Sequence, residues 1–88
     1  MGESGRRLIA LEAEAMFTLG MHHELGLTGV EDDVEALAWH TLAAADGHAE
    51  ALHHVRMLDR ILGPDRLDQA RVRTRQLYEE VRTWRALG

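Results

Sequence analysis

Cysteine and lysine are absent from this chain of 88 residues, and proline and serine occur once each. Without cysteine the chain can form neither a disulfide framework nor a thiolate metal site, and it has no cysteine nucleophile. Only four residues are aromatic, and much of the 45% hydrophobic content is alanine. Stability must therefore come from close packing of helices, and a domain this small often gains more by self-association.

Two further absences restrict location and chemistry. No apolar run is long enough to cross a membrane, and the segment that follows Arg7 becomes acidic at Glu12, too soon for a secretory signal. Ser4 is the only serine, no glycine-rich phosphate loop follows a strand, and no strand is expected at all. We therefore expect a cytoplasmic protein with no membrane partner, no cofactor and no catalytic site.

The net charge of -5 is unevenly distributed along the chain. Residues 1–63 carry eleven acidic residues and four arginines, a balance of −7, whereas residues 64–88 carry four acidic residues and six arginines, a balance of +2. These six arginines suggest a stripe for nucleic acid. Acidic residues interrupt the stripe at helical neighbour spacing, as Asp68 does beside Arg71. Because the whole chain is also acidic, we expect no nucleic-acid binding.

The recurrence of apolar residues at every third or fourth position predicts four helices. Glycine and proline mark the breaks, since residues 26–29 offer two glycines for positive φ and Pro64 suits the first turn of a helix. Asp32 or Asp33 is suited to cap the second helix. The helices are expected from after Ser4 to near Gly26, from Asp33 to about Asp46, from about His48 to Leu62, and from Pro64 over about 22 residues.

A short motif occurs twice in the chain. The tripeptide Ala-Glu-Ala at positions 13–15 returns at positions 49–51, which is 36 residues later. This period is typical of stacked helical hairpins. Between the two copies, Gly20 allows helix backbones to approach closely and Trp39 fills the space that is left. A residue larger than glycine at position 20 is expected to overpack the hairpin.

These residues resemble the Sel-one-like repeat, a relative of the tetratricopeptide repeat whose unit is an antiparallel helix pair. The resemblance implies an all-α fold of antiparallel helical hairpins in an α–α superhelix, with about four helices and a long C-terminal capping helix. It also implies one domain over residues 1–88, with a full repeat at about 13–48 and a degenerate capping repeat at about 49–88. Eleven positions are in register with the family pattern: Ala13, Ala15, Leu19, Gly20, Gly26, Asp32, Ala36, Trp39, Ala43, Ala44 and Gly47.

The resemblance implies a function as well. In this family the usual binding surface is a shallow concave face formed by the first helix of each pair. We therefore expect a non-catalytic scaffold or adaptor that binds a protein or peptide partner. The candidate contact residues on that face are Glu14, Thr18 and His22.

The last helix carries a heptad-like apolar pattern. It is expected to extend past the shorter hairpin, so that Val81 and the apolar residues after it lack cover. Exposed apolar residues on one helical seam favour pairing, which predicts a homodimer or a partner bound through this helix. The alternative is that the end of the helix folds back over Leu8 and Leu11 and completes the monomer core. The expected seam consists of Leu77, Val81, Trp84 and Leu87.

Six histidines suggest a metal site or a pH switch, and four of them form the adjacent pairs His22-His23 and His53-His54. Neighbouring histidines on a helix point about 100° apart, and no His-x-x-x-His pair occurs, so we expect no metal ligands among them. His23 and His40 stand where the family has tyrosine, which implies half-buried rings with one nitrogen hydrogen-bonded. A histidine-based metal or pH-responsive assembly is the alternative function.

Overall fold

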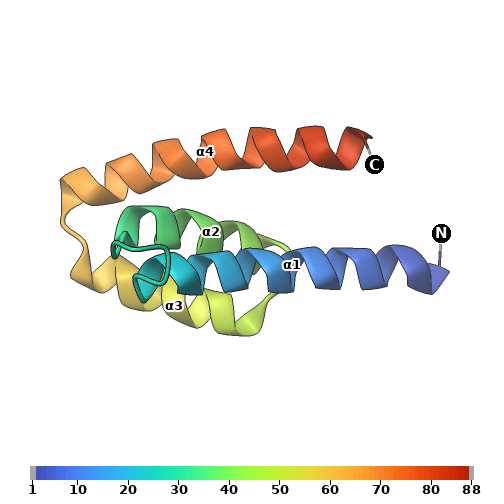
Figure 1. Cartoon of the computed structure of the whole chain (residues 1–88), viewed down its shortest axis with the longest axis horizontal. Coiled ribbons are helices and arrows are strands. Elements are labelled where there is room, and N and C mark those ends of the chain that lie inside the picture. The colour runs from blue at the N-terminus through green and yellow to red at the C-terminus, as the bar shows by residue number, and fades with distance from the viewer. Residues whose placement is uncertain (1, 88) are drawn as a thin grey trace.

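The computed structural model describes the backbone of residues 2–87 and the side chains of residues 12–87. Within this part of the chain there is no strand, and no helix has both the length and the apolar character needed to cross a membrane. The predicted all-α fold with a long last helix is confirmed, whereas the α–α superhelix remains a prediction. The four helices are α1 (Gly2–Glu24), α2 (Asp33–Ala45), α3 (Ala49–Ile61) and α4 (Pro64–Leu87) (Figure 1).

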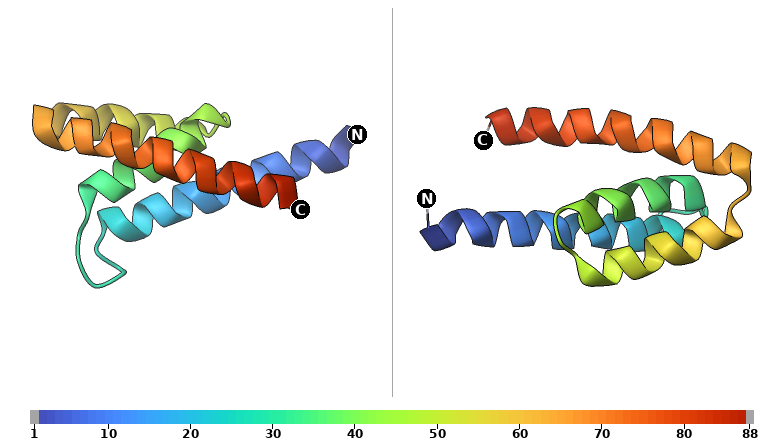
Figure 2. Two further views of the ribbon diagram at one scale, coloured as in Figure 1. Left: turned by 90° about the horizontal axis from the view of Figure 1, so that it is seen from above. Right: turned by 180° about the vertical axis from the view of Figure 1, so that it is seen from behind.

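Consecutive helices run in opposite directions (Figure 1). The helices α1 and α3 lie on one side of α2, and α4 lies on its other side (Figure 2). Both termini are at the same end of the molecule, where α1 and α4 extend beyond the two shorter helices. The last helix is therefore longer than the hairpin it packs against, as its sequence predicts.

The second helix is the central element, because it is apolar around most of its circumference. Seven of its 13 residues are buried, and each of the other three helices packs against it. The buried side chains form two clusters, one shared by all four helices and one shared by α2, α3 and α4. The first contains Met16, Trp39, Leu42, Ala51, Leu77 and Val81, and the second contains Leu37, Leu58, Leu62 and Ala70.

The expectation that Val81 lacks cover is wrong. Leu77 is 1% exposed and Val81 is 8% exposed, since both pack with Trp39 of α2 in the first core cluster. The heptad face of α4 is thus used inside the single chain over most of its length. Of the expected seam, Trp84 and Leu87 remain exposed, at 63% and 82%. The proposed packing over Leu8 and Leu11 involves side chains outside the described residues.

Gly26, two residues after Glu24, ends α1. Gly26 has a φ of 73°, a conformation that side chains with a β-carbon rarely adopt. Its N–H donates to the carbonyl of His23 at 3.3 Å, and the N–H of Leu27 donates to the carbonyl of His22 at 2.8 Å. This pair of bonds is the Schellman ending of a helix. It stops α1 at the point where the Glu24 side chain faces the rest of the fold.

The later helices begin at the predicted residues. The carboxylate of Asp32 accepts a hydrogen bond from the N–H of Glu35 at 3.0 Å and caps α2. Pro64 is the first residue of α4. The first helix differs, since it begins at Gly2 and not after Ser4.

Two arginines attach α4 to the other helices. Arg73 donates two hydrogen bonds to the carboxylate of Glu35 in α2, at 2.7 and 2.9 Å. Arg85 donates to Glu12 of α1 at 2.7 Å and to Asp46 in the turn after α2. The middle of α4 is therefore bound to α2, and its exposed end is bound to α1.

Candidate functional site

A buried histidine lies at the centre of the interface between α1 and α2. His40 is 0% exposed, whereas the sequence predicts a half-buried ring. Its ring fits because residue 20 of α1 is glycine, which brings no side chain to the same space. A β-carbon placed on Gly20 would lie 2.6 Å from both Cε1 and Nδ1 of the ring. The Gly20 position, which the sequence marks as a close helix contact, thus makes room for His40.

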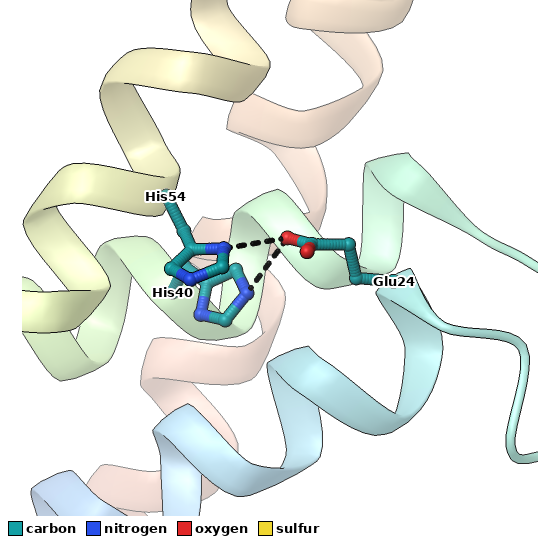
Figure 3. A group of neighbouring side chains, drawn as sticks. All are labelled: Glu24, His40 and His54. Carbon is teal, nitrogen blue, oxygen red and sulfur yellow. Dashed lines mark hydrogen bonds and ion pairs between the residues drawn. The ribbon is translucent and has the colours of Figure 1, made fainter.

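Two further polar side chains meet His40. Oε1 of Glu24 lies 3.3 Å from Nε2 of His40 and 3.0 Å from Nδ1 of His54 (Figure 3). The three residues come from α1, α2 and α3, and their nitrogen and oxygen donors all lie within 4.8 Å of one another. The Glu24 and His54 side chains are 14% and 19% exposed. We call this group the histidine cluster.

The two histidines of the cluster differ in their hydrogen bonding. Nδ1–H of His54 donates to Glu24. Nε2 of His40 is at ion-pair distance from the same oxygen, but its direction does not make a hydrogen bond, and Nδ1 has no partner either. An unsatisfied buried polar group costs about 1–3 kcal/mol. The Nδ1 edge of the buried ring therefore has no partner among the described residues, while Nε2 faces the Glu24 carboxylate without a well-directed hydrogen bond.

Burial is the largest influence on the pKa of His40 and lowers it from its ordinary value. The Glu24 carboxylate acts in the opposite direction, while the nearby rings of His54 and His48 add to the lowering. The lowered pKa means that the His40 ring is neutral at pH 7. A neutral imidazole has a lone pair on one nitrogen, which is the form that binds metal ions.

An aromatic side chain covers the cluster. The ring of Phe17 lies 5.4 Å from that of His40 and 5.6 Å from that of His54, between ring centres. The rings of His40 and His54 are 4.9 Å apart and tilted by 29°. Phe17 also stacks on His48 at 4.3 Å. The polar atoms of the cluster therefore lie against an apolar wall, where electrostatic interactions are stronger than in water.

His48 has a different role, because both of its ring nitrogens are occupied. Nδ1 accepts a hydrogen bond from the N–H of Ala51 at 3.1 Å, which caps α3. The proton of a neutral ring must then be on Nε2, and this nitrogen lies 2.7 Å from Oε2 of Glu14. His48 thus joins the start of α3 to α1.

The three residues predicted to contact a partner lie on an exposed face of α1. Glu14, Thr18 and His22 are all exposed. Two of them make contacts within the chain, since Glu14 binds His48 and the Thr18 hydroxyl donates to the carbonyl of Glu14 at 2.9 Å. Their spacing of four residues places them along one side of the helix. Among the side-chain hydrogen bonds within residues 12–87, Thr18 makes only this bond to Glu14, and His22 makes none.

An apolar groove lies on another face of the molecule, between α1 and α4. Its volume is about 400 Å³. Glu12 and Arg85, which bind each other, lie at its edge, and the exposed ring of Trp84 forms part of its wall. We call it the α1–α4 groove. Its apolar lining consists of Ala15, Met16, Leu19, Trp39, Val81 and Trp84.

The sequence did not predict the histidine cluster. His40 and His54 are 14 residues apart on different helices, so no local spacing rule connects them, and Glu24 comes from a third helix. One feature of the sequence was informative: Gly20 is a small residue at a close helix contact, and the large side chain that it faces is His40. No family model matches this chain, and no curated protein or solved structure matches it either. The relation to Sel-one-like repeats therefore remains a prediction from the residues quoted above.

Proposed function

We propose that this chain is a non-catalytic, cytoplasmic protein-interaction module that binds an amphipathic helix in the α1–α4 groove. The observation that carries the proposal is the position of Trp84, which is 63% exposed at the wall of an apolar groove of about 400 Å³. Leu87, one turn further along the same helix, is 82% exposed. The resemblance to Sel-one-like repeats supports the same general role.

The energetics favour an occupied groove. Burying a large apolar side chain stabilises a protein by about 1.5–3 kcal/mol, and exposed apolar surface of this kind marks interaction sites in many proteins. A helix that places apolar residues three and four positions apart fits a groove between two helices. The two helices that contribute most of the groove lining, α1 and α4, extend beyond α2 at the end of the molecule that holds both termini (Figure 1).

The occupant that we propose is α4 of a second copy of this chain. Residues 64–88, which include α4, have a balance of +2 and residues 1–63 a balance of −7, so α4 of a second copy approaches a chain body of opposite charge. Trp84 lines the groove, and Leu87 is exposed three residues further along α4. In a two-fold dimer, α4 of each copy can cover the groove of the other.

We place binding at this groove and not on the α1 face of Glu14, Thr18 and His22. Glu14 and Thr18 already make hydrogen bonds within the chain, and that face is polar. The groove, in contrast, is bordered by Leu19 and Trp84, whose exposed apolar surface gains from being covered.

Light scattering coupled to size exclusion tests the proposal. The wild-type chain is expected to be a dimer at micromolar concentration, and Trp84→Ala is expected to be a monomer. Tyr78→Ala is the matched control, because Tyr78 is a 50% exposed aromatic residue of the same helix that does not line the groove. A wild-type monomer at every concentration, or equal effects of the two variants, would contradict the proposal.

A further inference from the structure

The histidine cluster lies apart from the lining of the α1–α4 groove, and the proposed interaction makes no use of it. We infer that Glu24, His40 and His54 form a binding site for a divalent transition-metal ion, and that Zn²⁺ is the ion that fits it best. The inference rests on the arrangement of the donor atoms, on their chemical type and on the unsatisfied ring of His40.

The distances between the donors suit a tetrahedral ion. Zinc bonds to nitrogen and carboxylate oxygen are about 2.0–2.2 Å long, which places two ligands on one ion roughly 3.3 Å apart. Oε1 of Glu24 is 3.3 Å from Nε2 of His40 and 3.0 Å from Nδ1 of His54. Two of the three distances between ligand atoms are therefore close to those around a tetrahedral zinc ion. The donor atoms of the two histidines are at most 4.8 Å apart, so the two rings must move closer together for both to bind one ion.

The chemical types of the donors select the ion. Two imidazoles and one carboxylate are a donor set that holds Zn²⁺ in proteins, with water in the fourth position. Mg²⁺ and Ca²⁺ prefer sites made of oxygen ligands. The absence of cysteine removes thiolate ligands from consideration. A borderline transition-metal ion is thus favoured over both hard and soft ions.

The buried ring of His40 is the second, independent observation. His40 is 0% exposed, and neither of its ring nitrogens has a hydrogen-bond partner. An unsatisfied buried group in a folded protein needs an explanation, and an ion at the site is one of the recognised explanations. A metal ion bound to Nε2 gives this nitrogen a partner. At His54 the same ion takes the place of the proton on Nδ1, and the neutral ring then carries its proton on Nε2.

An ion can reach the cluster from solvent. Glu24 and His54 are partly exposed, while His40 forms the closed inner side. Water can therefore fill the remaining coordination position. The three ligands come from α1, α2 and α3, so the ion would bind only when these helices are assembled. Binding that is restricted to the folded chain raises its thermal stability.

Calorimetric titration of untagged, chelator-treated protein with Zn²⁺ tests the inference. We expect one ion per chain, a rise in melting temperature of about 10 °C at saturating Zn²⁺, and no response to Mg²⁺. Co²⁺ in place of Zn²⁺ should give the visible absorption of a tetrahedral site. Glu24→Gln and His54→Ala should each weaken Zn²⁺ binding by more than about 100-fold.

The chain offers a matched control in the residue before His54. His53 is exposed on the same helix and does not belong to the cluster, so His53→Ala should bind Zn²⁺ like the wild type. Circular dichroism establishes that each variant keeps its helices, and the two ligand variants test the site independently. The inference is overturned if the wild type binds no Zn²⁺, if both ligand variants bind normally, or if His53→Ala loses binding equally, which indicates adventitious binding to surface histidines.

Discussion

Gly20 of α1 lies directly against the buried ring of His40 in α2. Because glycine has no side chain, the ring fits into the space that a β-carbon at residue 20 would take. A β-carbon at residue 20 would be 2.6 Å from two ring atoms and 2.9 Å from Nε2. The ring is packed among Phe17, His54 and the backbone of α1, so it has little freedom to move away. This contact holds one ligand of the proposed metal site in place.

The first prediction concerns this contact. Gly20→Ala should lower the free energy of unfolding by roughly 1–3 kcal/mol, since overpacking outweighs the gain of up to about 1 kcal/mol from the better helix former. Urea denaturation measures the change. Gly63→Ala is the control, because a β-carbon at Gly63 meets nothing within 4 Å and its effect should stay within about 0.5 kcal/mol. Equal stability of the Gly20→Ala variant and the wild type would show that the His40 ring can move away from residue 20 at little cost.

The second prediction concerns pH. In the metal-free protein, the free energy of unfolding should fall as the pH is lowered from about 6.5 toward the lowered pKa of His40. Burial lowers the pKa of His40 in the folded chain, against the opposing effect of Glu24 and with the support of His54 and His48. The unfolded chain keeps the ordinary pKa of about 6.5 and binds more protons in this window, so acid favours unfolding.

Urea denaturation at several pH values, with a chelator present, checks this dependence. The stability that depends on His40 is complete above about pH 6.5 and is lost as the pH falls toward the lowered pKa of the folded chain. A free energy of unfolding that rises on acidification over this interval would mean that the pKa of His40 is raised and not lowered.

The third prediction compares two arginines of α4. Arg73 binds Glu35 with two hydrogen bonds in a partly buried position, at 33% and 17% side-chain exposure. Arg71 binds Asp68 in an open position, at 76% and 71% exposure. Arg73→Ala should lower the free energy of unfolding by about 1 kcal/mol. Arg71→Ala should change it by less than about 0.5 kcal/mol, and equal effects in denaturation would contradict a role for Arg73 in fixing α4.

The fourth prediction concerns the wall of the groove opposite Trp84. Leu19→Ala should weaken the proposed dimer about tenfold, since the truncated side chain loses roughly 1–1.5 kcal/mol of apolar burial. Leu52 on α3 is the control, because it is exposed to a similar extent and does not line the groove. Sedimentation equilibrium measures both dissociation constants. A similar loss for Leu52→Ala would place the interface elsewhere.

The sequence predicted most of the fold because its signals are local. Asp32 caps α2, Gly26 and Gly29 adopt positive φ, and Pro64 begins α4, and each of these follows from the chemistry of one residue. The cover of Val81 was missed because it depends on how α4 lies along α2, which no local pattern determines.

The two candidate sites were missed for the same reason, since each depends on how distant helices pack together. Leu19 and Trp84 lie far apart in sequence, and the groove between them exists only after α1, α2 and α4 are packed. Glu24, His40 and His54 are brought together from three helices, whereas the adjacent pairs His22-His23 and His53-His54, which the sequence makes conspicuous, form no joint site in the described residues. Spacing rules identify ligands on one helix but not ligands shared between helices.

We propose that the α1–α4 groove binds α4 of a second copy. Isotope-filtered nuclear Overhauser spectroscopy on a mixture of labelled and unlabelled chains tests it most directly, since only contacts between copies give signals. We expect signals from the indole ring of Trp84 in one copy to the methyl groups of Ala15 and Leu19 in the other. A concentrated sample without any such signals, or with signals that involve Tyr78 in place of Trp84, would contradict it.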